Sequence, residues 1–317
     1  MEAYLPMTEF FVLLNQILVL FILMGLGWYL TRTNHLTRAT ADQLTFLLCY
    51  VVTPCIVFYS FQRRYDPEKF HNLLLMLAVS CLIHLAFIVL GKLIFNARLI
   101  PEGYERAVLQ FSIVYTNCGF MGFPLLDTIL GADGVFYGSA YNAAFGLFLW
   151  THGLLLYSRR FDLSASLRAL VNPNIFAILL GVLFFAFSLS LPAPLMNSIH
   201  FLADLNSGLS MIVIGVLITS LPLSTLLQDR RVWAAVLLRN LLLPLGTVFF
   251  AAWYGFSGTL LLTIAIITAC PTAGMAVLLA TLNGRDTVFP SRIMIVSTIL
   301  SLVTVPAIVL FAKTLAA

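Results

Sequence analysis

Two short stretches of the chain combine proline, glycine and small polar residues inside long apolar runs. The first reads YTNCGFMGFP over residues 115–124, and the second reads TACPTAGM over residues 268–275. Proline removes a backbone donor and its ring clashes with the preceding helical turn, while glycine lowers the cost of leaving the helical conformation. We therefore expect both runs to be interrupted helices, with Pro124 and Pro271 at the interruptions.

An interrupted helix can bind an anion. Each interruption exposes unpaired N–H groups and a partial positive charge at the start of the next helical piece. Within a membrane, irregular backbone is tolerated only inside the protein or beside a water-filled cavity. We find no Lys or Arg near the middle of any apolar run, so two crossing interruptions are the expected way to hold a carboxylate.

Three polar residues within apolar runs are candidates for ion coupling or for the substrate pathway. Asp127 lies shortly after Pro124; an acid inside a membrane span suits proton coupling or cation binding, and the alternative is a position at the membrane edge. His152 could relay protons along a path shared with Asn142, or it could simply bond a neighbouring backbone. Both alternatives stay open at this point.

The composition decides the class of protein. Hydrophobic residues make up 61% of the 317 residues, charged residues make up 9%, and the mean hydropathy is +1.01. Soluble chains are about 45–50% apolar and about 25% charged. The fold class expected is an all-α polytopic membrane protein of about ten spans, each of roughly 20 residues. The candidate spans are residues 10–30, 44–61, 71–95, 106–131, 135–157, 173–191, 201–221, 232–254, 258–281 and 289–313.

The charges predict an orientation in the cytoplasmic membrane. Most of the 17 Lys and Arg residues, Arg239 among them, are assigned to one set of alternate loops and helix ends. Cytoplasmic loops carry the excess of positive charge, so both termini should face outward. The cations stand singly or in pairs between apolar runs, which is not the pattern of a nucleic-acid-binding surface.

The spans divide into two halves. Residues 1–157 form the first half and residues 173–317 the second, joined by a basic cytoplasmic linker at residues 158–172. Each half holds five of the candidate spans. An odd number makes the second half enter the membrane in the opposite orientation, and that is the condition for an inverted repeat, which is common among secondary transporters.

Several motifs resemble those of a known family. The segment NCGFMGFPLLDTILG, which begins at Asn117, resembles the fourth-span motif of the auxin efflux carrier family, which includes plant PIN carriers and bacterial malonate and malate permeases. Five other stretches agree in order along the chain: VVTPCIVFYSF, YNAAFGLFLW, VLLRNLLLPLG, CPTAGMAVLLATLNGRD and STILSLVTVPAIVLF. Cys118 and Gly119 stand where plant carriers have bulkier or hydroxylated residues, and the long cytosolic loop of those carriers is missing. Both departures favour a prokaryote-type permease.

The resemblance implies two inverted five-helix repeats in which helices four and nine cross at their prolines. It also implies alternating access between a scaffold bundle and a moving transport bundle, with Asn117 hydrogen-bonded to a substrate carboxylate. The expected partners are a small organic anion and the lipid bilayer, with a homodimer as an open alternative, and no cofactor or metal is expected. The candidate substrate-binding residues are Thr53, Pro54, Asn117, Cys118, Gly119, Met121, Gly122, Pro124, Cys270, Pro271, Thr272 and Gly274.

Two rival functions are weighed against this one. A sodium-coupled bile-acid-type symporter shares the ten-helix architecture, but it should place acidic and amide residues near both interruptions, and the second offers only Thr268 and Thr272 with the backbone. An intramembrane enzyme would need a paired nucleophile and base, a metal cluster or two close acids. The His and Asp residues are instead scattered over different spans.

Overall fold

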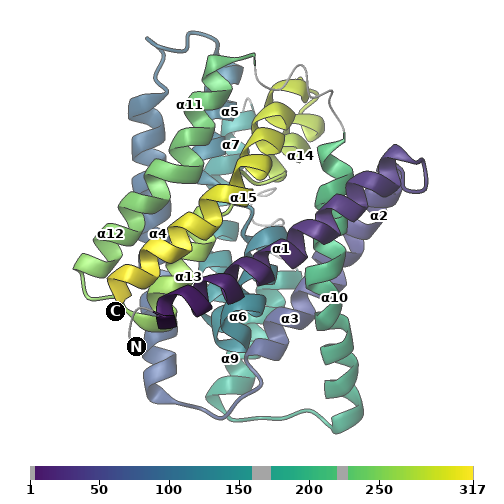
Figure 1. The fold of residues 1–317 in the computed structure, drawn as a ribbon, viewed down its shortest axis with the longest axis vertical. Helices are drawn as coiled ribbons and strands as arrows, with labels where there is room; N and C mark the ends of the chain where they lie inside the picture. The colour runs from purple at the N-terminus through teal and green to yellow at the C-terminus, as the bar shows by residue number, and fades with distance from the viewer. Residues whose placement is uncertain (1–3, 159–172, 220–227, 317) are drawn as a thin grey trace.

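The computed structural model describes residues 4–158, 173–219 and 228–316 (Figure 1). Within these ranges every regular element is a helix, and the one sign of β-structure is an isolated antiparallel bridge. The prediction of an all-α protein is therefore confirmed. The absence of other strands follows from the composition, because a long apolar run in lipid satisfies its backbone polar groups most readily as a helix.

Five helices of the described part are long and apolar enough to cross a membrane. They are Arg38–Ser60, Pro67–Ile94, Ala193–Ile218, Arg230–Trp253 and Val288–Leu315, and shorter apolar helices span Leu18–Arg32, Pro173–Ala186 and Gly258–Ala269. The predicted fourth and ninth spans are missing from the long set because each is interrupted, as described below.

The first half of the chain contributes the following elements. They are α1 (Tyr4–Arg32), α2 (Arg38–Leu47), the π-turn η1 (Leu48–Val52), α3 (Thr53–Ser60), α4 (Pro67–Ile94), α5 (Gly103–Val114), the π-turn η2 (Cys118–Gly122), α6 (Phe123–Phe148), the π-turn η3 (Leu149–Gly153) and α7 (Leu154–Tyr157). Helix α6 is kinked at Gly131, whose φ of 62° is a left-handed conformation that favours glycine. This kink separates the predicted fourth and fifth spans.

The second half contributes helices of similar length. They are α9 (Pro173–Ala186), α10 (Ala193–Ile218), α11 (Arg230–Leu237), the π-turn η5 (Leu238–Leu242), α12 (Leu243–Trp253), α13 (Gly258–Ala269), α14 (Met275–Leu282) and α15 (Val288–Ala316). In Figure 1, α11 and α12 follow one another as one long rod, whereas a non-helical connection separates α13 from α14.

Three prolines sit just after π-turns rather than at helix breaks. The π-turns η1, η2 and η5 end two residues before Pro54, Pro124 and Pro244, and each of these prolines lies in the first turn of the helix that follows. A π-turn is wider than an α-helical turn, so it accommodates a ring that has no N–H to donate. The prediction that Pro124 interrupts its helix is therefore wrong. The interruption lies upstream, between α5 and η2.

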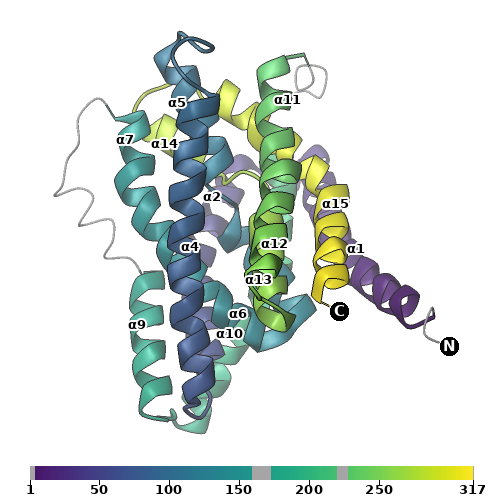
Figure 2. The ribbon, with the colours of Figure 1, turned by 90° about the vertical axis from the view of Figure 1, so that its left-hand side faces the viewer.

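The helices pack as two groups. One group, called here the α1 group, comprises α1, α2, α3, α9 and α10; α1 packs along α10, and α3 packs against both α9 and α10. The other, the α4 group, comprises α4 to α7 and α11 to α15, with α4 packed against α6 and α13 packed against α6, α12 and α15. Figure 2 shows α4 running the length of the α4 group, with α5 beside its upper part.

Glycine allows the closest contact in the α1 group. A Cβ atom built on Gly27 would lie 2.1 Å from the carbonyl oxygen of Ile212, and one built on Gly215 would lie 2.0 Å from that of Met24. No side chain fits at either position, so the backbones of α1 and α10 touch directly. Small residues permit this approach in membrane helices, where packing rather than hydrophobic burial drives association.

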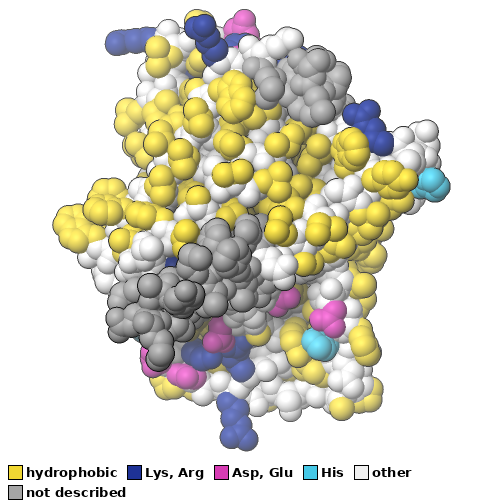
Figure 3. All heavy atoms as spheres, in the orientation of Figure 1, with side chains coloured by type: hydrophobic (Ala, Val, Ile, Leu, Met, Phe, Trp, Pro, Cys, Tyr) yellow, Lys and Arg dark blue, Asp and Glu magenta, His cyan; other side chains and the backbone are white. Residues whose placement is uncertain are grey.

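The outer surface is apolar. Phe201 and Trp253 are both 73% exposed, and Ile22 is 69% exposed. Figure 3 shows hydrophobic side chains across the middle of the visible face, with Lys and Arg side chains gathered toward its upper and lower ends. Such a band suits contact with lipid hydrocarbon, because exposing this much apolar surface to water is unfavourable.

Candidate functional site

The two interrupted helices meet inside the protein. Helix α5 ends at Val114 and α13 ends at Ala269, and the extended segments that follow pair as an antiparallel bridge between Thr116 and Thr272. The N–H of Asn117 donates to the carbonyl oxygen of Pro271 over 2.7 Å, and the N–H of Ala273 donates to that of Tyr115 over 2.9 Å. We call this pairing the crossover. Both segments are non-helical at this one buried point. Their pairing satisfies part of the hydrogen-bonding capacity of their backbone N–H and C=O groups.

Helical structure begins again in both segments just after the crossover. The π-turn η2 begins at Cys118, and α14 begins at Met275. The first N–H groups of a helix have no partner within it, and the aligned peptide dipoles add a partial positive charge at this end. Two such ends therefore lie beside the crossover, as the predicted interruptions require.

A cavity of about 270 Å³ opens beside the crossover. It lies between the α1 group and the α4 group, because its walls come from both. The lining residues are Cys49, Tyr50, Thr53, Thr116, Asn117, Gly119, Phe120, Asn142, Phe145, Gly146, Leu149, Trp150, Pro173, Asn174, Ile175, Ala273, Gly274, Met275 and Leu278. We call it the inner cavity. Five of the predicted residues line it: Thr53, Asn117, Gly119, Asn142 and Gly274.

A second cavity of about 460 Å³ adjoins the first. The two share lining residues at the crossover, including Asn117 and Gly274, and the second extends to Arg38 and Asp42 at the start of α2. Those two side chains form an ion pair with a nitrogen–oxygen distance of 3.4 Å and are more than half exposed, at 53% and 66%. The second cavity thus extends from an exposed ion pair to Asn117, which is 9% exposed.

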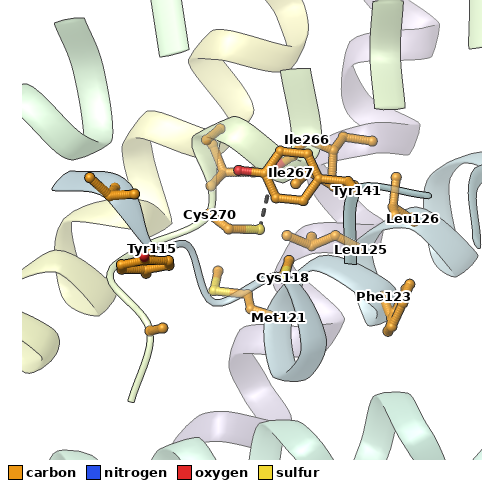
Figure 4. Packing of buried hydrophobic residues seen from close by; sticks show 14 of the residues in the cluster. Tyr115, Cys118, Met121, Phe123, Leu125, Leu126, Tyr141, Ile266, Ile267 and Cys270 are labelled. Atoms are coloured by element: carbon orange, nitrogen blue, oxygen red, sulfur yellow. Dashed lines mark hydrogen bonds between the residues drawn. The ribbon is translucent and has the colours of Figure 1, made fainter. Parts of the chain in front are cut away.

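Several predicted residues pack in the hydrophobic core next to the crossover and line neither cavity. Cys118, Met121 and Cys270 lie among apolar side chains of the core (Figure 4). The Cys270 thiol donates to the carbonyl oxygen of Ile266 over 3.2 Å, and a Cβ on Gly122 would lie 3.6 Å from the Cys270 sulfur. These residues fill space between the broken helices.

Other predicted residues act through the backbone or lie elsewhere. Pro271 contributes its carbonyl oxygen to the crossover, and the Thr272 hydroxyl donates to the carbonyl oxygen of Ser112 over 3.0 Å. Pro54 and Pro124 lie in first turns of helices. Asp127 is exposed and lines neither cavity.

His152 lies behind the crossover. Its Nδ1 is 3.0 Å from the hydroxyl of Tyr115, whose own O–H lies 2.8 Å from the carbonyl oxygen of Phe148. Asn142 faces the inner cavity, whereas His152 lines neither cavity. The structure therefore does not bring these two residues into one lined path.

The position of Arg239 differs from the prediction. The prediction put it at a helix end and left the centre of the protein without a cation, but the structure places it in η5 with 0% exposure. Its Nε and Nη2 donate to the carbonyl oxygen of Cys270 over 3.2 and 3.1 Å, Nη2 also donates to that of Thr268 over 2.6 Å, and Nη1 donates to that of Ile113 over 3.2 Å. One guanidinium thus joins the ends of α5 and α13.

Asn240, the next residue, holds the same region. Its Nδ2 donates to the carbonyl oxygen of Ser297 over 2.7 Å, the Ser297 hydroxyl donates to its Oδ1 over 2.6 Å, and the N–H of Thr272 donates to the Ser297 hydroxyl over 3.0 Å. The Arg-Asn pair within the run VLLRNLLLPLG was the available signal, because a charged residue followed by an amide is rarely placed in lipid.

Comparison with known proteins identifies the family. A family described as "Membrane transport protein" matches the chain twice, over residues 12–165 and 157–309. The chain belongs to the auxin efflux carrier family of membrane transporters. It is therefore a multi-pass membrane transport protein and not an enzyme. The double match is consistent with an internal repeat.

A relative from an archaeon supports the same assignment. The chain is 26% identical over 295 residues to a protein of Methanothermobacter thermautotrophicus described as an "Uncharacterized transporter". The alignment covers 92% of this carrier and 96% of the relative. The similarity therefore extends over nearly the whole transporter rather than one motif.

Proposed function

We propose that this carrier moves a small organic anion, a mono- or dicarboxylate, across the cytoplasmic membrane by alternating access. The observation that carries the proposal is the position of Asn117. It stands on the crossover, at the start of η2, and lines both cavities. Its side-chain amide can donate to a carboxylate, and the helix starts beside it favour negative charge.

The lining of the inner cavity supports an anion. Its polar side chains include the hydroxyls of Tyr50, Thr53 and Thr116 and the amides of Asn117, Asn142 and Asn174, and none of its lining residues is acidic. A carboxylate there meets no like charge, whose repulsion would cost several kcal/mol at short range. The remaining walls, including Phe145 and Trp150, are apolar and aromatic, which suits the carbon skeleton of an organic acid.

The two groups of helices support alternating access. The inner cavity lies at their boundary, with Thr53 from the α1 group on one side and Asn117 from the α4 group on the other. We take the α1 group as the scaffold and the α4 group as the moving bundle. Ten spans as two inverted repeats, residues 1–157 and 173–317 with a linker at 158–172, fit the double family match. The positive loops favour both termini outside.

The burial of two threonines weighs against a sodium-coupled symporter of the bile-acid type. Thr268 and Thr272, the polar side chains near the second interruption, are both 0% exposed. Neither lines either cavity, so neither hydroxyl oxygen faces a space in which a sodium ion could sit. Since Asp127 is exposed and outside both cavities, the geometry favours the membrane-edge alternative for this residue over ion coupling.

Uptake into proteoliposomes tests the proposal. A panel of labelled mono- and dicarboxylates is offered with and without sodium and proton gradients. Replacing Asn117 by Ala removes a hydrogen bond to a charged group, so uptake should fall by about 10- to 100-fold. Asn283→Ala is the matched control, because Asn283 is an amide whose Nδ2 bonds the carbonyl oxygen of Leu279 at the end of α14. If no carboxylate enters, or if both variants transport normally, the proposal fails.

A further inference from the structure

The crossover joins four helix ends of opposite polarity. The starts of η2 and α14 carry partial positive charge, while α5 and α13 end there with their carbonyl groups unpaired within the helix. Each helix end is equivalent to roughly half an elementary charge. Without another charge, the two positive ends and the two negative ends would largely cancel, and an anion beside the crossover would gain little.

Arg239 supplies the missing charge. Its guanidinium bonds three carbonyl oxygens at the ends of α5 and α13, those of Ile113, Thr268 and Cys270. Its one described ring contact is with Phe87, whose centroid lies 5.8 Å from Cζ. Among the described residues no carboxylate forms an ion pair with Arg239. A buried cation is costly unless it is paired and hydrogen-bonded, and here the two carbonyl ends take the place of a carboxylate.

We propose that Arg239 determines the charge selectivity of the substrate site. It offsets the two negative helix ends, so the positive ends of η2 and α14 face the inner cavity with no opposing charge behind them. Arg239 lines neither cavity, so it acts through the field at the crossover and not by contact with the substrate. The inference rests on the inner cavity being the substrate site, as proposed above.

A purely structural role for Arg239 is the competing explanation. The Asn240–Ser297–Thr272 bonds already hold the segment after α13 in place, so position and charge can be separated by substitution. Arg239→Lys keeps the charge but loses the planar fork that reaches three carbonyl groups. Arg239→Met keeps an unbranched apolar stem and loses the charge.

Charge-selective thiol labelling measures the field without a transported substrate. A Cβ on Gly119 meets nothing within 4 Å, and Gly119 lines the inner cavity, so Gly119→Cys is a suitable reporter. Cys49, Cys55 and Cys81 are replaced by Ala, while Cys118 and Cys270 are buried and stay. The reagents are the anionic 2-sulfonatoethyl and the cationic 2-(trimethylammonium)ethyl methanethiosulfonates, and the readout is the ratio of their labelling rates.

Arg239→Met should lower the anionic-to-cationic ratio by at least about tenfold, because losing a unit charge inside the protein slows the anionic reagent and speeds the cationic one. Arg239→Lys should keep most of the ratio. Ser257→Cys is the control reporter, because Ser257 is exposed before the far end of α13, and its ratio should not change. An unchanged ratio at Gly119→Cys in Arg239→Met, or an equal loss in Arg239→Lys, overturns the proposal.

A second comparison covers the case in which Arg239→Met does not fold. With Arg239 intact, the ratio at Gly119→Cys should exceed that at Ser257→Cys by about tenfold, and equal ratios overturn the proposal. A protein that labels in this way but takes up no carboxylate would contradict the proposed function and leave the role of Arg239 standing. The two failures are therefore distinguishable.

Discussion

The two interrupted helices share a backbone design but present different groups to the cavity. The first presents the amide of Asn117 and the open face of Gly119. The second presents Ala273 and Gly274, while its polar Thr272 is fully buried and bonded to Ser112. In the function proposed above, the first interruption recognises the ligand and the second supports it. A shared break in the backbone does not dictate a shared role, because the side chains beside it decide what a ligand meets.

The largest effect should come from reversing the charge preference of the first interruption. Asn117→Asp places a carboxylate where we propose that a carboxylate binds. At about 4 Å and an effective dielectric of about 20, the repulsion is about 4 kcal/mol, or roughly 1,000-fold in affinity. Uptake of the best carboxylate of the panel measures it. Uptake within a few-fold of wild type would show that the first interruption is not the recognition side.

An intermediate effect should appear in stability at the second interruption. Thr272→Val keeps the shape of the side chain and removes its donor, which leaves the Ser112 carbonyl oxygen without that bond. A buried unpaired acceptor costs about 1–3 kcal/mol, so the melting temperature in detergent should fall, while the KM of the remaining folded carrier stays near wild type. Thr314→Val is the control, since its hydroxyl is exposed and bonds only the carbonyl oxygen of Phe311. A raised KM in Thr272→Val with unchanged melting would reverse the two roles.

The smallest effect separates the two glycines of the crossover. A Cβ on Gly119 projects into open space, whereas one on Gly274 lies 3.5 Å from the Met294 sulfur, an ordinary van der Waals contact. Gly119→Ala should therefore reduce uptake of the bulkier carboxylates of the panel by a few-fold relative to the smaller ones, and Gly274→Ala should leave that order unchanged. Measuring uptake of the full panel for both variants decides the matter. The same change in both would remove the distinction between the interruptions.

The sequence predicted the interruptions but not their geometry. Proline and glycine within apolar runs correctly pointed to the segments near Asn117 and Pro271. The exact place of the first break was wrong, because the π-turn before Pro124 accommodates the proline without breaking the helix, and a proline alone does not tell whether such a turn precedes it. The sequence also does not predict which residues line the cavity. Cys118 and Gly119 are neighbours on the same turn, and only Gly119 lines the inner cavity.

Arg239 shows a different limit of sequence reading. Counting positive charges treats an Arg within a few turns of a loop as interfacial, because a free guanidinium is costly in lipid. That cost is offset when carbonyl groups from two broken helices converge on the side chain, and the convergence exists only in three dimensions. The residue that the charge count assigns to a helix end therefore lies fully buried at the crossover.

The contact between Gly27 and Gly215 has a mechanical consequence. Helix α1 comes from the first half of the chain and α10 from the second, yet their backbones touch with no side chain between them. Two rods in such contact cannot slide or roll past each other without a collision of main-chain atoms, so they resist shear as a single stiff unit. A conformational change in this carrier must therefore move other helices around that unit and leave the unit itself intact.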